Sequence, residues 1–232
     1  MFFARCDLSL TLHTGAKPLF FSEEHDDLFS HPLLQYPPEL ELSEEMNILF
    51  DGLDEGLLTA WEATKSFCSL INLAIEGRGR IPWTSYLNTM APVMYSLLHM
   101  SFKNGSFNEA IRLGLLVFCS QIFLQWEVVT MTHAHLLAAY EACLSRLEGL
   151  KTVPPHLLAW LLMIGAISTV RTIDDEIWMC QLKPCLLACK VSSWIDIRES
   201  LESFLWIGIV QNKPGKDVFD STMSKNDINQ VQ

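Results

Sequence analysis

Apolar residues recur at steps of three and four along most of this 232-residue chain, which is the spacing of one face of an α-helix. Residues 192–220 show the pattern best, with Ser193 as a candidate N-cap and Asp196 three residues later, close to a capping box. The apolar positions of this expected helix are Trp194, Ile197, Leu201, Phe204, Leu205 and Ile209. Residues 213–215, Lys-Pro-Gly, predict a sharp turn that ends it, because proline fixes φ and glycine accepts a positive φ.

The same periodicity predicts helices through most of the remaining chain. They are expected at residues 43–58, 61–75, 83–100, 109–126, 132–147, 157–170 and 174–187. Ser106 and Glu109 match a full capping box at the start of the fourth of these helices. Two segments, 109–126 and 157–170, are apolar on nearly all sides, which is typical of buried helices.

No segment alternates apolar and polar residues between turn signals, as a half-buried β-strand would. Pro92 and Pro184 are expected to kink two of the helices. The sequence therefore predicts an all-α fold, with about eight helices, two of them apolar and buried, in a single multi-helix domain. We expect this domain over residues 43–220, followed by a polar, disordered tail over residues 221–232.

Residues 1–42 are expected to form an acidic, weakly structured N-terminal arm, because four prolines interrupt any regular pattern. Residues 1–62 hold thirteen acidic residues against two basic ones, Arg5 and Lys17. Large apolar residues lie among the acids. Two interpretations stay open: an extended arm that covers the domain, or an acidic-hydrophobic, activation-like segment that folds on a partner.

Residues 63–232 carry fourteen acidic and fourteen basic residues, so the net charge of −11 comes from the N-terminal segment alone. No basic patch is visible, and we expect no direct binding to nucleic acid. Arg78 and Arg80 lie between glycines and could contact a phosphate. Solvated arginines in a turn are the preferred interpretation, because no strand or helix N-terminus completes a phosphate cradle.

Half of the residues are hydrophobic, which raises the question of a membrane span. The apolar run at residues 157–170 has fourteen residues, whereas a span needs about 20, so we expect buried core helices instead. Seven cysteines, an odd number, are scattered along a chain without a recognisable secretory signal. This usage is typical of reduced thiols packed as small hydrophobes in an intracellular protein.

Three cysteines, Cys180, Cys185 and Cys189, lie within ten residues, and the last two share a helix face. Zinc sites usually contain a C-x-x-C pair or two histidines at three to five residues, and neither occurs here. His133 and His135 are two residues apart, so on a helix they point in different directions. We therefore interpret the thiols as core residues and predict no metal site.

Catalytic motifs are also missing from the sequence: it contains no G-x-S-x-G elbow, no G-x-G-x-x-G and no Walker loop. The acids at residues 174–176 are expected to complement the N-terminal dipole of a helix. His99, His133 and Asp174 are the candidate acid–base groups if the chain is an enzyme, but nothing in the sequence places them together. We predict no catalytic and no cofactor-binding residue and leave enzyme activity open.

Four segments carry a resemblance to a known family. They are residues 95–99 (Tyr-Ser-Leu-Leu-His), residues 109–114 (Glu-Ala-Ile-Arg-Leu-Gly), residues 153–155 with the apolar helix that follows, and the Trp194 helix with residues 204–206 and 213–216. In order and spacing they resemble the fungal-specific transcription factor domain, the helical regulatory region that follows a binuclear zinc–six-cysteine DNA-binding module. The resemblance covers about residues 42–219.

The resemblance implies a helical regulatory domain in the nucleus, and it supplies no catalytic residue and no cofactor to carry over. The chain departs from the family pattern because nothing before Cys68 supplies the six-cysteine module, and Cys6 stands alone in an acidic segment. We expect either a domain fragment or a free-standing relative without DNA contact.

Three functional hypotheses follow. The first is a transcription-regulator-like domain that acts through a protein partner or as a homodimer, with a small-molecule ligand left open. The second is a small helical enzyme of fungal secondary metabolism with an apolar pocket. The third is a membrane-associated protein, which the short apolar runs disfavour.

Overall fold

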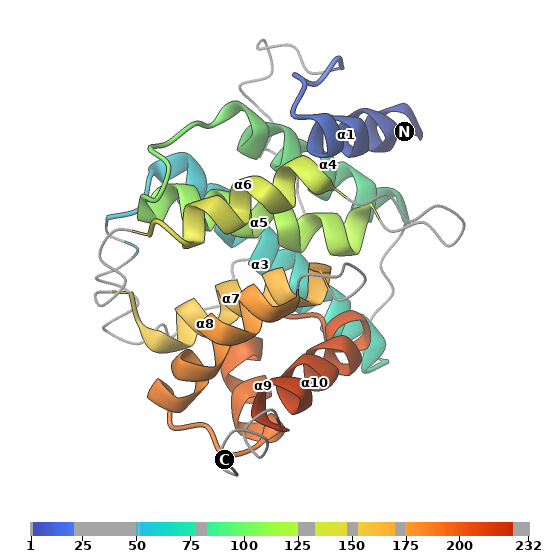
Figure 1. Cartoon of the computed structure of the whole chain (residues 1–232). Helices are drawn as coiled ribbons and strands as arrows, with labels where there is room; N and C mark the ends of the chain where they lie inside the picture. The colour runs from blue at the N-terminus through green and yellow to red at the C-terminus, as the bar shows by residue number, and fades with distance from the viewer. Residues whose placement is uncertain are drawn as a thin grey trace. The chain divides into compact units, whose positions relative to one another are not determined.

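The computed structural model describes residues 2–20, 50, 52–77, 83–124, 133–147, 153–169 and 175–224. Within them the chain is an all-α domain of nine helices without a strand, which confirms the predicted fold class (Figure 1). The helices are α1 (Phe2–Thr14), α3 (Glu55–Ile75), α4 (Trp83–His99), α5 (Phe107–Phe123), α6 (Ala134–Leu144), α7 (Pro155–Thr169), α8 (Asp175–Ala188), α9 (Trp194–Ser203) and α10 (Gly208–Ser224). They group into two compact units, Met1–Leu150 and Lys151–Gln232.

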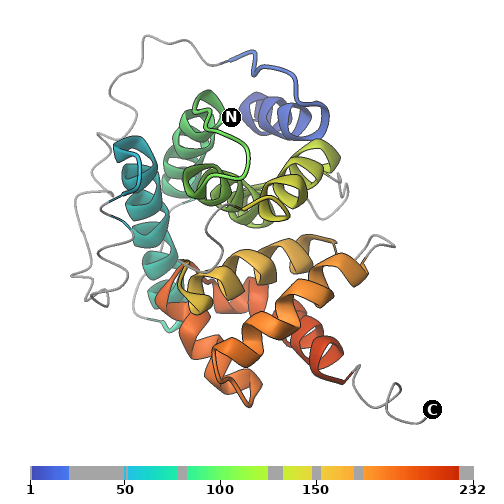
Figure 2. The same cartoon turned by 60° about the vertical axis from the view of Figure 1, so that its left-hand side comes forward.

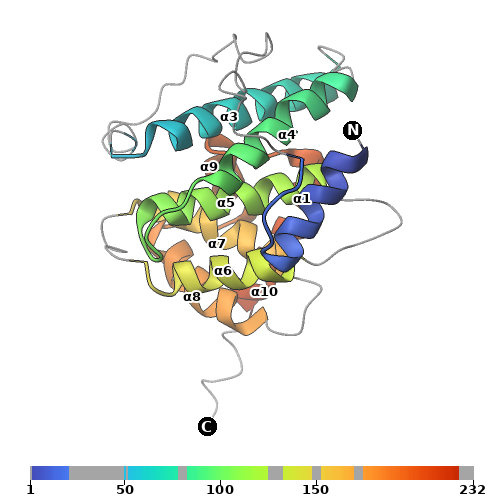
Figure 3. The ribbon, with the colours of Figure 1, turned by 90° about the horizontal axis from the view of Figure 1, so that it is seen from above.

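In the first unit, α3 packs along α4, and α5 packs against α3, α4 and α6 (Figure 3). Helix α1 lies against α6 and α4, which follow it by about a hundred residues in the chain (Figure 2). The apolar helix α5 is buried along most of its length, as the sequence predicts. Its fully buried side chains in the first unit include Ile111, Leu115 and Phe118.

In the second unit, α7 packs on α8, and α10 contacts α7, α8 and α9. The apolar helix α7 is also buried, which confirms the second predicted core helix. Trp160 of α7 is fully buried, and its indole Nε1 donates to the carbonyl of Leu205 at 2.8 Å. Gly165 permits close approach, because a Cβ there would lie 2.3 Å from the ring of Trp178. Only a residue without a side chain fits this contact.

Residues 213–215 do not form the predicted turn, because they lie inside α10. The apolar face expected to continue along one helix is instead interrupted at Phe204, where ψ is −111°. Four consecutive residues, 204–207, are buried, and one helix face cannot bury four in a row. The chain therefore bends there. Gly215 permits the close contact of α10 with two indole rings, because a Cβ added at this position would lie 2.8 Å from Trp194 and 3.0 Å from Trp206.

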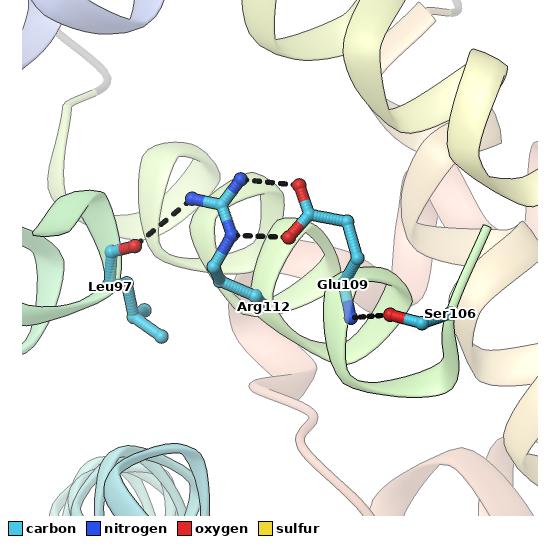
Figure 4. A network of polar contacts seen from close by, with 4 residues as sticks. All are labelled: Leu97, Ser106, Glu109 and Arg112. Atoms are coloured by element: carbon cyan, nitrogen blue, oxygen red, sulfur yellow. Dashed lines mark hydrogen bonds and ion pairs between the residues drawn. The ribbon is translucent and has the colours of Figure 1, made fainter. Parts of the chain in front are cut away.

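The capping box at Ser193 is confirmed: its side chain accepts from the Asp196 amide at 3.3 Å, and the Asp196 carboxylate accepts from the Ser193 amide at 2.9 Å. The capping box at Ser106 is only half formed. The Ser106 hydroxyl accepts from the Glu109 amide at 3.2 Å, but the Glu109 carboxylate turns to Arg112 instead (Figure 4). The guanidinium competes for the carboxylate with charge-assisted hydrogen bonds, which are stronger than a bond to an amide.

Two expectations about the ends of the chain need correction. Residues 1–42 were expected to be weakly structured, but Phe2–Thr14 form helix α1. The first proline is residue 18, so nothing in the first fourteen residues interrupts a helix. At the other end, α10 continues to Ser224, beyond the expected domain boundary at residue 220. Residues 21–49 and 225–232, and with them most of the arm and of the tail, lie outside the described residues.

Helices α4 and α8 continue through Pro92 and Pro184. The helix expected at residues 43–58 is described only from residue 50 onward, apart from residue 51, and there α3 begins at Glu55. Asp54 caps α3, because its carboxylate accepts from the amides of Gly56 and Leu57.

Candidate functional site

The strongest concentration of buried polar groups lies where α1 meets α4 and α6, and we call it the α1 seam. Asp7 of α1 is 4% exposed, and its carboxylate accepts hydrogen bonds from three donor groups. The donors are the amides of Leu19 at 2.9 Å and Phe20 at 3.1 Å and the hydroxyl of Tyr95 at 3.0 Å. Burial, the hydrogen bond to Asp7 and the charge of Asp7 all raise the pKa of Tyr95. The tyrosine therefore stays a donor and fastens α1 to α4.

The opposite side of the seam contains histidines. His133, just before α6, has its Nε2 at 3.3 Å from the hydroxyl of Ser9. Burial, with a smaller contribution from His13, lowers the pKa of His133 to about 4, so its ring is neutral at pH 7. The ring of His135 lies against Gly15, where a Cβ would come within 2.5 Å of Nε2. Gly15 has φ of 74°, which favours glycine independently of this contact.

A cation also anchors α1 to α5. The guanidinium of Arg5 donates to the carbonyl of Phe123, the last residue of α5, and lies 5.3 Å from the centre of the Phe123 ring. The positive charge suits the carbonyl end of a helix, where the dipole is negative. The α1 seam thus places an acid (Asp7), a hydroxyl (Ser9) and a cation (Arg5) on one short helix, and each has a partner from a distant part of the chain.

An exposed apolar surface lies on α1 and on the segment that follows it, and we call it the α1 stripe. It consists of Phe3 and Leu10 of α1, which are 68% and 48% exposed, and of Leu19 and Phe20 beyond the helix, which are 77% and 62% exposed. The rings of Phe3 and Phe20 lie 6.3 Å apart, a distance typical of a direct aromatic contact. Cys6 of α1 is exposed as well. Helix α1 is therefore apolar both toward the core, through Leu8 and Leu12, and toward solvent.

A half-buried ion pair organises the start of α5 (Figure 4). Arg112 donates from Nη2 and Nε to the two carboxylate oxygens of Glu109, at 2.6 Å and 2.8 Å, and from Nη1 to the carbonyl of Leu97 at 3.0 Å. This bidentate geometry fixes both side chains and ties α5 to the last turn of α4. Every charged group of the network has its partner, so the arrangement is structural.

The second unit contains a pair of thiols at the end of α8. Cys185 is buried, and its Sγ donates to the carbonyl of Pro155 at 3.2 Å. Cys189 is half-buried and lies one helical turn beyond Cys185. The interaction with Cys189 and burial raise the pKa of Cys185, whereas the interaction with Cys185 lowers the pKa of Cys189. Cys180, the third thiol of this helix, is exposed.

The structure separates the candidates that the sequence singled out. His99 donates from Nδ1 to the carbonyl of Tyr95 in its own helix, at 2.9 Å. His133 contacts Ser9 in the α1 seam. Asp174, Arg78 and Arg80 lie outside the described residues. In the part of the chain that the structure describes, no three His, Cys, Asp or Glu side chains are grouped so that they could hold a metal ion.

Sequence reasoning missed Asp7, Ser9 and the helix that positions them. An acid and a serine in a short N-terminal segment resemble solvated residues, and their buried partners are 88 and 124 residues away. The available signal was Leu8 and Leu12, whose four-residue spacing indicates a helix face.

Among the described helices, none combines the length and the hydropathy that a transmembrane segment requires. Comparison of the chain with protein-family models, with curated protein sequences and with solved structures finds no match. The geometry of the α1 seam and the α1 stripe therefore carries the functional argument.

Proposed function

We propose that this protein is a helical regulatory domain of the kind found in fungal transcription factors, and that it acts by binding a protein partner through the α1 stripe. The carrying observation is the exposure of Phe3 on α1 and of Leu19 and Phe20 just beyond it, next to a helix whose other face is held by the α1 seam. Large aromatic and aliphatic side chains gathered on one surface are typical of protein interaction sites. The resemblance of the four packing segments to the transcription factor family supports the same class of function.

The rigid seam matters for this proposal. A flexible apolar helix must lose conformational freedom when a partner binds, and that loss weakens the complex. Helix α1 is fixed beforehand by Asp7, Ser9 and Arg5, each bonded to another part of the first unit. The stripe is thus presented on an ordered support, which lowers the cost of association.

Charge decides which kind of partner fits. The stripe contains no charged side chain, but the sequence that follows it, residues 23–45, contains eight acidic residues and no lysine or arginine. Two copies of the chain that met through the stripe would bring two acidic segments together, which is unfavourable. The occupant is therefore a different protein, with an apolar surface bordered by basic residues.

A tethering experiment tests the function. The full chain is fused to an unrelated DNA-binding domain, and transcription of a reporter with the matching operator is measured in fungal cells. We expect the wild-type fusion to change reporter transcription and the double variant Phe3→Ser, Leu10→Ser to abolish the change. The matched control is Ile195→Ser, which removes an exposed apolar residue of the second unit and should leave the effect intact. A wild-type fusion that leaves the reporter unchanged overturns the proposal.

A binding experiment tests the charge argument separately. The probes are two synthetic amphipathic helices that share the same leucine face, one with lysine and one with glutamate on the polar face. Fluorescence anisotropy should show binding of the lysine peptide to the wild type, weaker binding to the double variant and no binding of the glutamate peptide. Equal binding of both peptides would contradict a partner whose apolar surface is bordered by basic residues. Sedimentation tests the alternative: if the wild type forms a stable dimer and the double variant does not, the occupant is a second copy of the chain.

A further inference from the structure

We propose that Asp7 is the positioning residue of the α1 stripe. Its carboxylate holds residues 15–20, which we call the strap, against α1 and thereby sets Phe20 beside Phe3. The inference rests on the proposed function, because it concerns the assembly of the same surface. It names the contact on which half of the stripe depends, since Leu19 and Phe20 belong to the strap.

The strap begins where α1 ends. Helix α1 stops at Thr14, and the amide of Gly15 donates to the carbonyl of Thr11 at 2.8 Å, with φ of 74° at Gly15. A left-handed residue with this hydrogen bond is a common way to end a helix. The amide of Ala16 then donates to the hydroxyl of Thr14 at 3.2 Å. The chain therefore leaves the helix axis at Gly15.

The strap returns to the middle of α1. The amide of Leu19 donates to both oxygens of the Asp7 carboxylate, at 2.9 Å and 3.1 Å, and the amide of Phe20 donates to Oδ2 at 3.1 Å. Asp7 precedes Thr14 by about two helical turns, so the strap runs back along the helix for that length. Pro18 lies directly before the two donors, and its fixed φ restricts the conformations of the strap.

This return brings the strap to the first turn of α1. Phe3 precedes Asp7 by four residues and therefore lies one turn away on the same side of the helix. The ring of Phe20, whose amide is bound to Asp7, lies 6.3 Å from the ring of Phe3. The backbone contact at Asp7 and the ring contact at Phe3 thus fix the same residue of the strap.

The Asp7 carboxylate depends on the strap in turn. Asp7 is 4% exposed, and its donors are the two strap amides and the hydroxyl of Tyr95, all of which are uncharged. A buried carboxylate that loses its donors is strongly destabilised. Release of the strap would remove two of these three donor groups. The strap therefore stays closed as long as Asp7 is intact.

Partner binding needs both halves of the stripe. Protein interfaces draw most of their binding energy from a few large side chains that become buried against the partner. With the strap released, Leu19 and Phe20 leave the surface, and a partner would have to order them again, which weakens the complex. Asp7 is itself buried, so it acts on binding through the strap and not by touching the partner.

The first measurement needs no partner. Hydrogen–deuterium exchange of single amides is followed by NMR of the full chain. In Asp7→Asn the amides of Leu19 and Phe20 should exchange about tenfold faster than in the wild type, because they lose their acceptor, and the Leu12 amide within α1 should keep its rate. Unchanged rates in the strap, or an equal increase at Leu12, overturn the proposal.

Tyr95→Phe is the matched control. It removes the hydrogen bond between Asp7 and α4 and leaves both strap bonds in place, so the strap amides should keep their wild-type rates. Gly15→Ala acts from the other end of the strap, because φ is positive there and a Cβ would lie 2.5 Å from the ring of His135. It should accelerate exchange as Asp7→Asn does. If circular dichroism shows that Asp7→Asn is unfolded, the rates in Gly15→Ala decide.

The second measurement connects the strap to the partner, with the lysine peptide described above as the probe in fluorescence anisotropy. Asp7→Asn should weaken binding about tenfold, and so should the strap variant Leu19→Ser, Phe20→Ser, which keeps both amides. Adding Asp7→Asn to the strap variant should cause no further loss, because the side chains that Asp7 positions are already absent. A further loss of similar size overturns the proposal.

The two proposals fail separately. If the wild-type fusion leaves the reporter unchanged, the proposed function fails, and the exchange rates of Leu19 and Phe20 still decide whether Asp7 positions the strap. If the wild type binds the lysine peptide and Asp7→Asn binds it equally well, the proposed function stands and the role of Asp7 is overturned.

Discussion

The α1 seam in the first unit and the aromatic cluster in the second unit hold their helices in opposite ways. The aromatic cluster consists of Trp194, Trp206 and Phe219, with ring centres 6.3 Å and 6.1 Å from Trp194 and with Gly215 packed between the indoles. The α1 seam instead relies on ionisable groups with directional hydrogen bonds. The stability of the aromatic cluster does not depend on pH, because apolar packing involves no titratable group. The stability of the α1 seam depends on the protonation state of its groups.

Substitution in the aromatic cluster should have the largest effect on stability. Trp206 is 1% exposed, and its Nε1 donates to Asn212 Oδ1 at 2.7 Å. Trp206→Ala should lower the free energy of unfolding by about 3–5 kcal/mol, because it leaves a cavity and an unpaired amide oxygen. Urea denaturation followed by circular dichroism measures the change. Ile209→Ala is the control, because Ile209 is 73% exposed. A similar loss in the free energy of unfolding for this variant would show that the effect is not specific to the aromatic cluster.

The seam should respond to pH, and the cluster should not. His133 has a folded pKa of about 4 against an ordinary value of 6.5, so the unfolded chain binds its proton more readily. The contribution of His133 is complete above pH 6.5 and is lost as the pH falls toward 4, up to about 3 kcal/mol. Unfolding measured between pH 7 and 4 should show this slope in the wild type. In His133→Gln the slope should be smaller, and an unchanged slope would remove His133 as its source.

A smaller effect is expected from the acid of the seam. Asp7→Asn keeps the shape of the side chain but points an amide donor at the donors of Leu19 and Phe20, and it should cost about 2 kcal/mol in urea denaturation. Tyr95→Phe removes one of the three donors and should cost about 1 kcal/mol. The double variant should cost less than the sum, because the two groups share a hydrogen bond. If the two losses of stability add exactly, the hydrogen bond between Tyr95 and Asp7 contributes nothing to stability. Asp217→Asn, on the exposed side of α10, should have little effect.

The comparison also explains what the sequence could predict. Helices α5 and α7 were predictable because apolar residues fill nearly all their positions, and the cap at Ser193 because Asp196 is only three residues away. The bend at Phe204 was not predictable, because the apolar spacing alone does not show whether residues 204–207 continue a helix face or leave the helix and are all buried. The turn predicted at residues 213–215 was wrong because these residues lie inside α10, where Gly215 permits the contact with Trp194, which lies elsewhere in the chain.

The candidate site was the least predictable part. Local rules describe partners within about four residues, and the seam joins Arg5 to Phe123 and Ser9 to His133. The thiol pair at Cys185 and Cys189 was visible as a shared helix face, but the acceptor on Pro155 and the positive φ of Lys190 were not.

The long separation of the seam partners has a consequence for synthesis of the chain. Arg5 and its acceptor on Phe123 are 118 residues apart, so at 5–20 residues per second α1 waits roughly 6–24 s on the ribosome before that partner has been made. During this time both apolar faces of α1 are without their final neighbours, whereas Trp206 finds Asn212 after only six residues. A helix that waits in this way is a natural substrate for ribosome-associated chaperones, and its capture by them would precede any encounter with a regulatory partner.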